Sequence, residues 1–248
     1  MSKEVRFEIC IDSVQGAVIA QEAGAARVEL CDNLIEGGTT PSAGMIQTAR
    51  AQVDIGLNVI IRPRGSDFCY SEVEFEVMKR DVELAGAWGA DGVVIGVLTP
   101  EGCVDLERTG ALIGLARPLS VTFHRAFDMV KNPHQSLEDL VTLGVDRVLT
   151  SGLENSALEG LDMIRDLVKQ AENRITVMPG GGIHERNVLK IVQESGACEV
   201  HISARSQADS RMTFRNPRAY MGGEFRSPEF AWKATDGDRI RAFKDTLK

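Results

Sequence analysis

Gly24-Ala25-Ala26-Arg27-Val28 is the first of four pentapeptides with the pattern Gly-[Ala/Val]-x-x-Val, and these pentapeptides decide the fold. Each copy follows a helical pattern of apolar residues and opens a short β-branched run. Glycine accepts the left-handed conformation that ends many helices, and the two variable residues turn the chain into a strand. The other copies begin at Gly89, Gly144 and Gly196. Their spacing leaves room for two strand–helix units between copies, which predicts eight units.

Strands and helices are expected to alternate along the whole chain. Such alternation favours right-handed parallel crossovers. A length of 248 residues is typical of a (β/α)8 barrel. The fourfold pattern, and the lack of GxGxxG after the first strand, favour the barrel over an open sheet. We therefore predict an α/β fold in which residues 1–248 form a single (β/α)8 TIM barrel domain. The predicted strands are Val5–Ile11, Arg27–Cys31, Leu57–Ile61, Gly92–Val97, Leu119–Phe123, Arg147–Thr150, Ile175–Met178 and Glu199–Ile202.

Several helix starts can be read from the sequence. Ser71-x-x-Glu74 and Ser156-x-x-Glu159 have the form of capping boxes. Asn132-Pro133 places a capping side chain before a proline at the first helical position.

The segment over residues 204–235 departs from this rhythm. It is long, polar and rich in arginine and aromatic residues, and Asp238–Leu247 then predicts the eighth helix. A long loop after the last strand covers the barrel mouth, contacts another subunit or is an ordinary surface excursion. Because arginine and aromatic side chains are enriched at interfaces, we expect a homodimer or higher homo-oligomer.

Composition excludes several classes of protein. A formal net charge of -8 argues against nucleic acid or an acidic membrane as the main partner. The chain has no apolar run of about 18 residues that would span a bilayer, and its start has no signal-peptide pattern. Five scattered cysteines without a CxxC pair argue against a disulfide framework and a structural zinc site. We expect a cytoplasmic protein.

Polar residues gather at the predicted C-terminal ends of the strands, where barrels of this kind carry their sites. Because side chains alternate along a strand, Glu8 and Cys10 share one face of the first strand, and Glu29 and Cys31 share one face of the second. Neighbouring strands thus present the same Glu-x-Cys pair. Either glutamate is a candidate proton donor or acceptor.

The third strand leads into Arg62-Pro63-Arg64, and two interpretations of these arginines remain open. In one, Glu8 and Glu29 face Arg62 and Arg64 in a buried ion-pair layer that fills the barrel. In the other, the arginines bind an anionic group of a substrate.

Two further segments predict a cradle for phosphate. Thr150-Ser151-Gly152 follows the sixth strand, Gly180–Gly182 follows the seventh, and Ser203 follows the eighth. Consecutive glycines let backbone N–H groups approach an anion, at the usual phosphate position of a barrel. The alternative is a tight turn before the next helix.

Histidines and cysteines complete the candidate set. His124-Arg125-Ala126-Phe127-Asp128 follows the fifth strand, and His201 lies on the eighth. We take His124, His201 and Asp128 as candidate acid/base groups and Arg125 as an anion-binding candidate. Cys10 and Cys31 are candidate soft-metal ligands, with core filling as the alternative.

Taken together, these strand-end segments resemble the CutC copper-homeostasis family over about residues 5–225. The resembling segments include Glu8-Ile9-Cys10, Arg27-Val28-Glu29-Leu30-Cys31-Asp32, Phe123-His124-Arg125-Ala126-Phe127-Asp128 and Met178-Pro179-Gly180-Gly181-Gly182. The resemblance implies a cytoplasmic, commonly oligomeric barrel with a role in copper tolerance and copper(I) as its ligand.

Three hypotheses follow from the sequence. In the first, Cys10 and Cys31 bind Cu(I) in copper homeostasis. In the second, an orphan enzyme acts on a phosphorylated or carboxylated small molecule held by Arg62, Arg64 and Gly180–Gly182. In the third, a scaffold works through its arginine-rich C-terminal loop.

Overall fold

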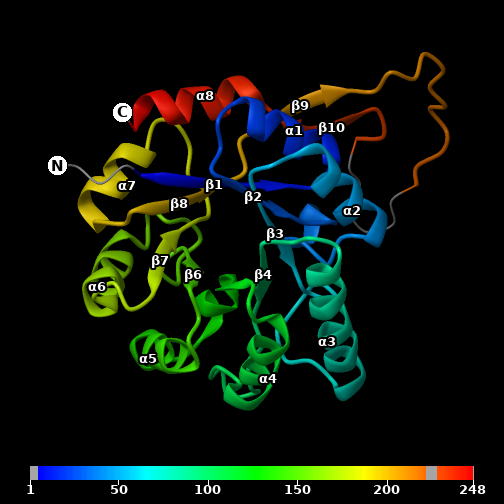
Figure 1. The fold of residues 1–248 in the computed structure, drawn as a ribbon. Helices are drawn as coiled ribbons and strands as arrows, with labels where there is room; N and C mark the ends of the chain where they lie inside the picture. Colours follow the sequence, from blue (N-terminus) through cyan, green and yellow to red (C-terminus); the bar gives the residue numbers. More distant parts are fainter. Residues whose placement is uncertain (1–4, 222–227, 248) are drawn as a thin grey trace.

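A ring of parallel strands surrounded by helices forms the body of the molecule (Figure 1). The computed structural model describes residues 5–221 and 228–247. All eight predicted strands are confirmed, with bounds that move by at most two residues. They are β1 (Arg6–Ile11), β2 (Arg27–Leu30), β3 (Gly56–Ile60), β4 (Gly92–Ile95), β5 (Ser120–Phe123), β6 (Arg147–Thr150), β7 (Thr176–Pro179) and β8 (Glu199–Ile202).

Helices follow the strands and cover the outside of the ring (Figure 1). They are α1 (Val14–Glu22), α2 (Ala43–Gln52), α3 (Glu72–Ala87), α4 (Leu106–Ala116), α5 (Pro133–Leu143), α6 (Leu161–Ala171), α7 (Val188–Ser195) and α8 (Gly237–Thr246), with short 3-10 turns η1 (Leu34–Glu36) and η2 (Arg125–Met129). None of the described helices combines the length and the apolar character that a membrane span needs.

The four pentapeptide glycines work as predicted. Gly24, Gly89, Gly144 and Gly196 have φ angles of 84°, 87°, 76° and 75°, in the left-handed region that an L-residue with a side chain enters only at a cost. Each ends a helix and directs the chain into the next strand. The fourfold pattern therefore marks the same turn four times around the barrel.

Two of the three predicted helix starts are confirmed. Ser71 and Glu74 form a reciprocal capping box on α3, and the side chain of Asn132 caps α5 ahead of Pro133. The prediction for Ser156 was wrong in part. Its hydroxyl accepts a hydrogen bond from the Glu159 N–H at 3.3 Å, but α6 begins only at Leu161. The pair therefore closes a turn that precedes the helix.

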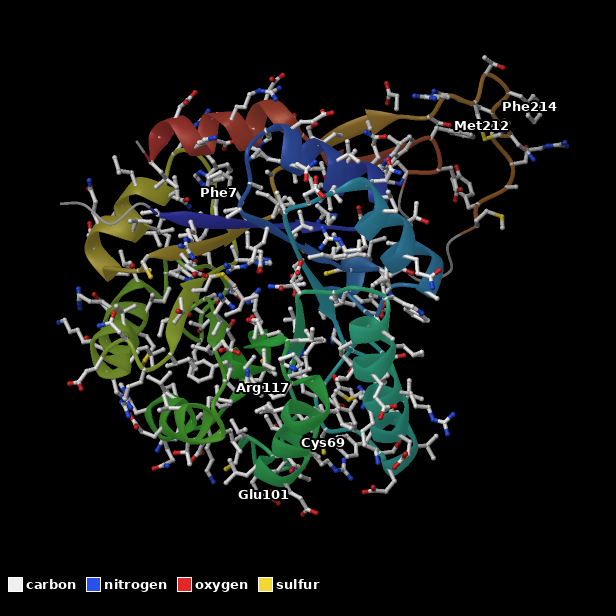
Figure 2. All side chains as sticks on the ribbon, in the orientation of Figure 1. Phe7, Cys69, Glu101, Arg117, Met212 and Phe214 are labelled. Atoms are coloured by element: carbon white, nitrogen blue, oxygen red, sulfur yellow. The ribbon has the colours of Figure 1, made fainter. Side chains whose placement is uncertain are left out.

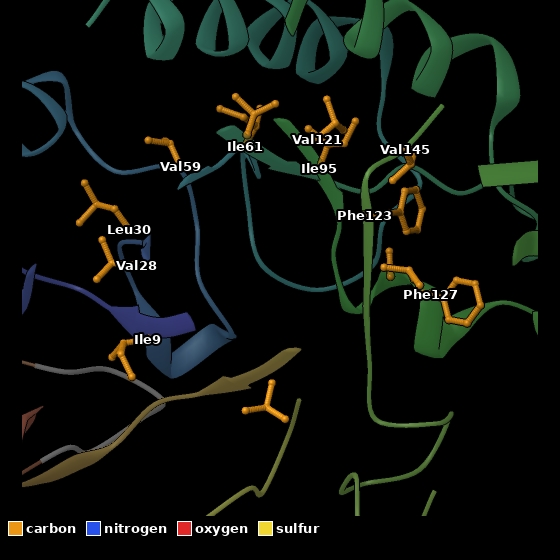
Figure 3. Close-up of a cluster of buried hydrophobic side chains, with 14 of the residues drawn as sticks. Ile9, Val28, Leu30, Val59, Ile61, Ile95, Val121, Phe123, Phe127 and Val145 are labelled. Atoms are coloured by element: carbon orange, nitrogen blue, oxygen red, sulfur yellow. The ribbon is translucent and has the colours of Figure 1, made fainter. Parts of the chain in front are cut away.

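Most of the apolar core lies between the ring and the helices. Alternate strand residues such as Ile9, Leu30, Val59 and Ile95 are buried there, as Figure 3 shows. The opposite faces of the same strands point into the ring. They contribute a second, small apolar cluster of Cys10, Cys31, Ile60 and Val94. The remaining interior of the barrel is largely polar, and this is where the candidate site lies.

The ring closes through a narrow seam. Hydrogen-bonded ladders join the strands in the order β7-β6-β5-β4-β3-β2-β1-β8. Between β7 and β8, the described residues show a single parallel bridge from Gly180 to His201. A Cβ on Gly180 would lie 3.2 Å from the Cβ of His201, so a glycine is needed for this close approach.

The segment after β8 contains more structure than the sequence indicated. Its two ends pair as the antiparallel strands β9 (Arg205–Asp209) and β10 (Ala231–Thr235), and the chain between them extends away from the barrel (Figure 1). Residues 222–227 lie outside the described part of this segment. The predicted eighth helix is confirmed as α8. That residues 1–248 make up one domain stays a prediction.

Candidate metal centre inside the barrel

Two cysteine sulfurs meet inside the ring. The Sγ atoms of Cys10 and Cys31 lie 3.8 Å apart, and both side chains are buried. The register of β1 and β2 explains this, because Cys10 stands opposite Glu29 and Cys31 follows two residues later on the same face. The prediction that these strands present paired Glu-x-Cys faces to one another is therefore confirmed.

The two thiols have opposite tendencies to ionise. The hydrogen bond from Cys31 lowers the pKa of Cys10 to about 5, against the effect of burial, and His201 adds to this lowering. The same hydrogen bond raises the pKa of Cys31 well above its ordinary value, and burial raises it further. At neutral pH, the pair consequently holds one proton and one negative charge.

His201 is enclosed by acids. Its Nδ1 lies 2.8 Å from Glu8 Oε1, and its Nε2 lies 3.5 Å from Glu29 Oε2. Burial lowers the pKa of His201, but hydrogen bonds to Cys10 and Glu8 outweigh it, so this pKa is raised well above its usual value. The imidazole is therefore a cation at neutral pH and compensates the Cys10 thiolate.

The two glutamates differ in how readily they ionise. Burial raises the pKa of Glu8, but the hydrogen bond from His201 and the charge of Arg27 lower it to about 2. Burial raises the pKa of Glu29 well above its ordinary value, and the negative charge of Cys10 raises it further. Glu8 is therefore a carboxylate at neutral pH, whereas Glu29 holds its proton more tightly than Glu8 does.

Below the thiols, a buried ion-pair layer fills the barrel. Arg27 Nε lies 2.6 Å from Glu8 Oε2, and Arg27 Nη2 lies 2.5 Å from Glu199 Oε2. Arg147 Nε lies 2.8 Å from the same Glu199 oxygen. Asn58 Nδ2 donates to Glu8 Oε2 at 2.9 Å. Each interior carboxylate that is ionised thus has a cation beside it.

This layer corrects the prediction that Glu8 and Glu29 face Arg62 and Arg64. The layer exists, but its arginines are Arg27 and Arg147, which were not among the predicted site residues. Strand alternation could have identified Arg27 as an inward-facing residue. Arg27 lies two residues before Glu29, so it had to share the inward face.

The two predicted anion-binding arginines have separate environments. Arg62 is buried and donates from Nη1 to the carbonyl oxygens of Glu36 (2.7 Å) and Gly38 (2.8 Å). Arg64 lies 2.6 Å from Glu74 Oε1, near the start of α3. Because β3 ends at Ile60, strand alternation does not set the direction of either side chain in this loop.

The predicted phosphate cradle holds a carboxylate of the protein itself. Asp128 Oδ1 accepts from Thr150 Oγ1 (2.5 Å) and from the Ser151 N–H (2.9 Å), and Oδ2 accepts from Ser151 Oγ (3.0 Å) and Arg125 Nε (2.7 Å). The Gly152 N–H donates to Thr150 Oγ1 at 2.9 Å. Arg125, Thr150 and Ser151 therefore come together as predicted, around Asp128.

The other predicted residues are distributed around the mouth. Gly180 forms the seam with His201, and Gly181 and Gly182 turn the chain with φ angles of 95° and 67°. Ser203 is exposed. His124 is buried on β5's C-terminal side, where burial and the charge of Arg62 lower its pKa to about 3.

A cavity of about 670 Å³ opens near the thiols. Asp12, two residues after Cys10, and Asp32, the residue after Cys31, contribute to its wall. Strands β9 and β10 contribute two basic side chains and an aromatic ring to the cavity wall, from Arg205, Lys233 and Trp232. Arg205 Nη1 lies 3.6 Å from Asp12 Oδ2.

The donor atoms suit a soft metal ion. One ligand atom each from Cys10, Glu29 and Cys31 lie within 4.8 Å of one another, and so do those of Glu8, Glu29 and His201. Two metal–sulfur bonds of about 2.3 Å, the length in zinc thiolates, bridge sulfurs up to about 4.6 Å apart. The separation of 3.8 Å between the two sulfurs fits this span. Thiolates select Cu(I) and other soft ions.

The comparison with known families matches this chain over residues 5–206 to the CutC family. The chain belongs to the CutC family. It is 53% identical over 242 residues to a protein of Mus musculus named "Copper homeostasis protein cutC homolog", covering 98% of this chain and 89% of the relative. A Homo sapiens protein of the same name has the same identity and coverage.

Bacterial relatives extend the likeness. A CutC family protein of Chromobacterium violaceum is 48% identical, covering 97% of each chain. The crystal structure of a CutC protein from Streptococcus agalactiae, described as a putative copper homeostasis protein, superposes with a TM-score of 0.76 at 36% identity, covering 80% of this chain and 98% of that one. Phosphoribosylanthranilate isomerase from Thermotoga maritima, at 15% identity and a TM-score of 0.58 over 98% of both chains, shares the fold alone.

Proposed function

We propose that this CutC-family protein takes part in copper homeostasis by binding Cu(I) between Cys10 and Cys31. The separation of 3.8 Å between their sulfurs, inside an otherwise polar barrel, is the observation that carries the proposal. The names of the mouse and human relatives support the copper role. The cavity lined by Asp12 and Asp32 lies next in sequence to the two cysteines, and we propose it as the entry for the ion.

The charge of the cluster favours a monovalent ion. In the metal-free pair, one proton lies between two sulfurs that otherwise carry two negative charges. Replacing that proton by Cu(I) leaves the net charge unchanged, so the balance with the His201 cation is kept. A divalent ion would add one uncompensated positive charge in a buried site, which is costly. We therefore propose selectivity for Cu(I) over divalent ions.

The test is an anaerobic Cu(I) titration against a chromophoric chelator. Wild type is expected to bind about one equivalent, because the two thiols form one site. Cys10→Ser/Cys31→Ser is expected to lose this binding. The matched control is Cys69→Ser/Cys103→Ser, which alters two cysteines outside the barrel interior. If the Cys10/Cys31 variant withheld Cu(I) from the chelator as well as wild type does, the proposal would be wrong.

We also propose that the protein works in the cytoplasm as a homo-oligomer. The described cysteines are all free, which suits a reducing compartment. The arm between β9 and β10 exposes apolar side chains far from the barrel, among them Met212 and Phe214 (Figure 2). Burying them against a second copy would remove this exposed apolar surface. Light scattering of the purified protein measures the assembly directly.

The orphan-enzyme hypothesis stays a prediction. Asp128 accepts from Thr150 and Ser151 of the predicted phosphate cradle, and Arg64 pairs with Glu74. Neither observation favours a phosphorylated substrate at this position.

A further inference from the structure

Arg62 is a buried cation with an unusual environment. It is 5% exposed, and it forms no ion pair among residues 5–221 and 228–247. Its Nη atoms donate to three backbone carbonyl oxygens, whereas its buried Nε has no acceptor among these residues. Buried charges are normally paired because an uncompensated charge in a protein interior is costly. The missing partner must therefore come from outside the described chain.

His124 supplies a second buried donor at the same end of the barrel. Its Nδ1 accepts from the Ala126 N–H at 3.1 Å, so the neutral ring carries its proton on Nε2. Its pKa, lowered to about 3, keeps it neutral at physiological pH. Nε2 is buried and has no acceptor among the described residues. A buried donor without an acceptor destabilises the fold, because it has lost its hydrogen bonds to water.

The two side chains border the same aromatic ring. The guanidinium carbon of Arg62 lies 5.1 Å from the Phe68 ring centroid, and the imidazole centroid of His124 lies 5.0 Å from it. Gly96, the residue directly after β4, lies next to His124. A Cβ there would overlap the His124 ring, so glycine leaves room for that ring. The buried Tyr70 hydroxyl lies beside the Arg62 guanidinium and is the third polar group here.

We propose that this donor cluster, made of Arg62, Tyr70 and His124, binds a small carboxylate anion. A carboxylate has two acceptor oxygens for two N–H donors, and its single negative charge compensates a single guanidinium. A metal cation is excluded by the charge of Arg62 and by the protonated Nε2. The position, at the C-terminal ends of the strands, is where barrels of this fold bind their ligands.

This anion site is separate from both sites already described. The thiol pair lies on β1 and β2, and the Asp128 carboxylate already satisfies the cradle that follows β6. One contact joins the anion site to the thiols. Gly38 accepts from Arg62 Nη1 through its carbonyl, and a Cβ on Gly38 would lie 3.3 Å from Cys31 Sγ. An anion on Arg62 thus binds beside the loop that covers the thiols.

The experiment follows the His124 Nε2 proton by NMR of histidine-labelled protein during titration with sodium acetate. His124→Gln assigns the signal among the four histidines. A saturable downfield shift is expected with acetate, and no saturable shift with acetamide, which has a similar shape but no charge. An unchanged signal, or an equal response to both compounds, overturns the proposal and leaves only water on these donors.

Thermal unfolding of variants provides the second measurement. Acetate is expected to raise the midpoint of wild type and of Arg64→Gln, a matched loss of an arginine that already has acidic partners. The increase should disappear in Arg62→Gln, and also in His124→Leu, which keeps the anchoring of the loop by Arg62. Acetate stabilisation that persists in His124→Leu contradicts the site. Cys10→Ser/Cys31→Ser should keep its response to acetate, so this proposal and the copper proposal fail separately.

Discussion

At the scale of single residues, the two sulfurs 3.8 Å apart form one acid. Cys10 ionises early because Cys31 donates a hydrogen bond to its thiolate, and Cys31 retains its proton for the same reason. A proton held between two soft donors is readily exchanged for a soft monovalent ion. Copper binding to the two sulfurs at neutral pH should then release about one proton per ion, since Cys31 is the one of the two thiols that still has a proton.

The hydrogen bond between the thiols can be tested by removing its donor. In Cys31→Ala, the Cys10 thiolate loses the first cause of its lowered pKa, so this pKa should rise from about 5 towards its ordinary value of 9.0. Thiolate ultraviolet absorption measured against pH reports the midpoint. Cys103→Ala serves as the control and should leave the midpoint near pH 5. An unchanged midpoint in Cys31→Ala would show that another group stabilises the thiolate.

The sequence identified most of the residues of the metal centre but not their partners. Strand alternation was sufficient to place Cys10, Cys31 and Glu29 on one inward surface. It could not show that His201 reaches Glu8, because that contact depends on β8 pairing with β1, far away in the chain. Hydrogen-bond partners depend on the register between strands that are distant in sequence, and the sequence of one strand does not determine that register.

At the scale of structural elements, Asp128 ties η2 to the end of β6. Its carboxylate satisfies the Thr150 hydroxyl and backbone N–H groups of Ser151 and Leu153, with Arg125 on the outer side. A similar set of donors would hold a phosphate in related folds. The sequence predicted a bound phosphate here, and the structure places the Asp128 carboxylate against Thr150 and Ser151. The sequence could not indicate that the anion belongs to the protein.

Asp128→Ala should therefore have two effects. The variant should lose roughly 2–4 kcal/mol of unfolding free energy, because several buried donors lose their acceptor. Inorganic phosphate should restore part of this loss in the variant but leave wild type unaffected, which denaturant unfolding with and without phosphate measures. Asp139→Ala, on α5, is a control on an exposed carboxylate. A variant as stable as wild type would contradict the tying role.

In the loop after β3, the direction of the side chains can no longer be predicted from strand alternation. Arg62 and Arg64 are two residues apart, so strand alternation would place them on one face. The chain leaves the ladder at Ile60, and each arginine then follows its own local partners. Side-chain direction is predictable from sequence only while the chain remains in a regular element.

At the scale of the whole molecule, a polar barrel interior is surrounded by an apolar layer between the strands and the helices. The predicted glycine turns at Gly24, Gly89, Gly144 and Gly196 define the repeat of this layer. These local signals determine the fold. The ion-pair layer of Arg27, Glu8 and Glu199 is a product of closure, because its members come from strands at opposite ends of the sequence.

Removing Arg27 tests what this layer contributes. Arg27→Met should lower the unfolding free energy by about 3–5 kcal/mol, because two buried carboxylates lose their shared cation. Arg165→Met, which removes an exposed ion pair with Asp162, should cost at most about 1 kcal/mol. Chemical denaturation of both variants gives the comparison. Equal small losses would mean that the interior charges are solvated.

The same variant should change the dependence of stability on pH. Glu8 has a folded pKa of about 2, below its ordinary 4.5, so its contribution is complete above pH 4.5 and is lost as the pH falls towards 2. Without the charge of Arg27 this pKa rises. The decline of unfolding free energy across that window should therefore be shallower in Arg27→Met.

The seam between β7 and β8 has a consequence for how the interior communicates with its surroundings. Seven neighbouring strand pairs are joined by ladders, whereas Gly180 and His201 hold the eighth by one bridge. Separating these two residues splits the wall without unzipping any other strand. His201 is also the cation that compensates the thiolate, and the ladder between β8 and β1 holds it beside Glu8. The strand boundary with the fewest bridges in the barrel thus includes His201, the residue that supplies the balancing charge of the metal centre.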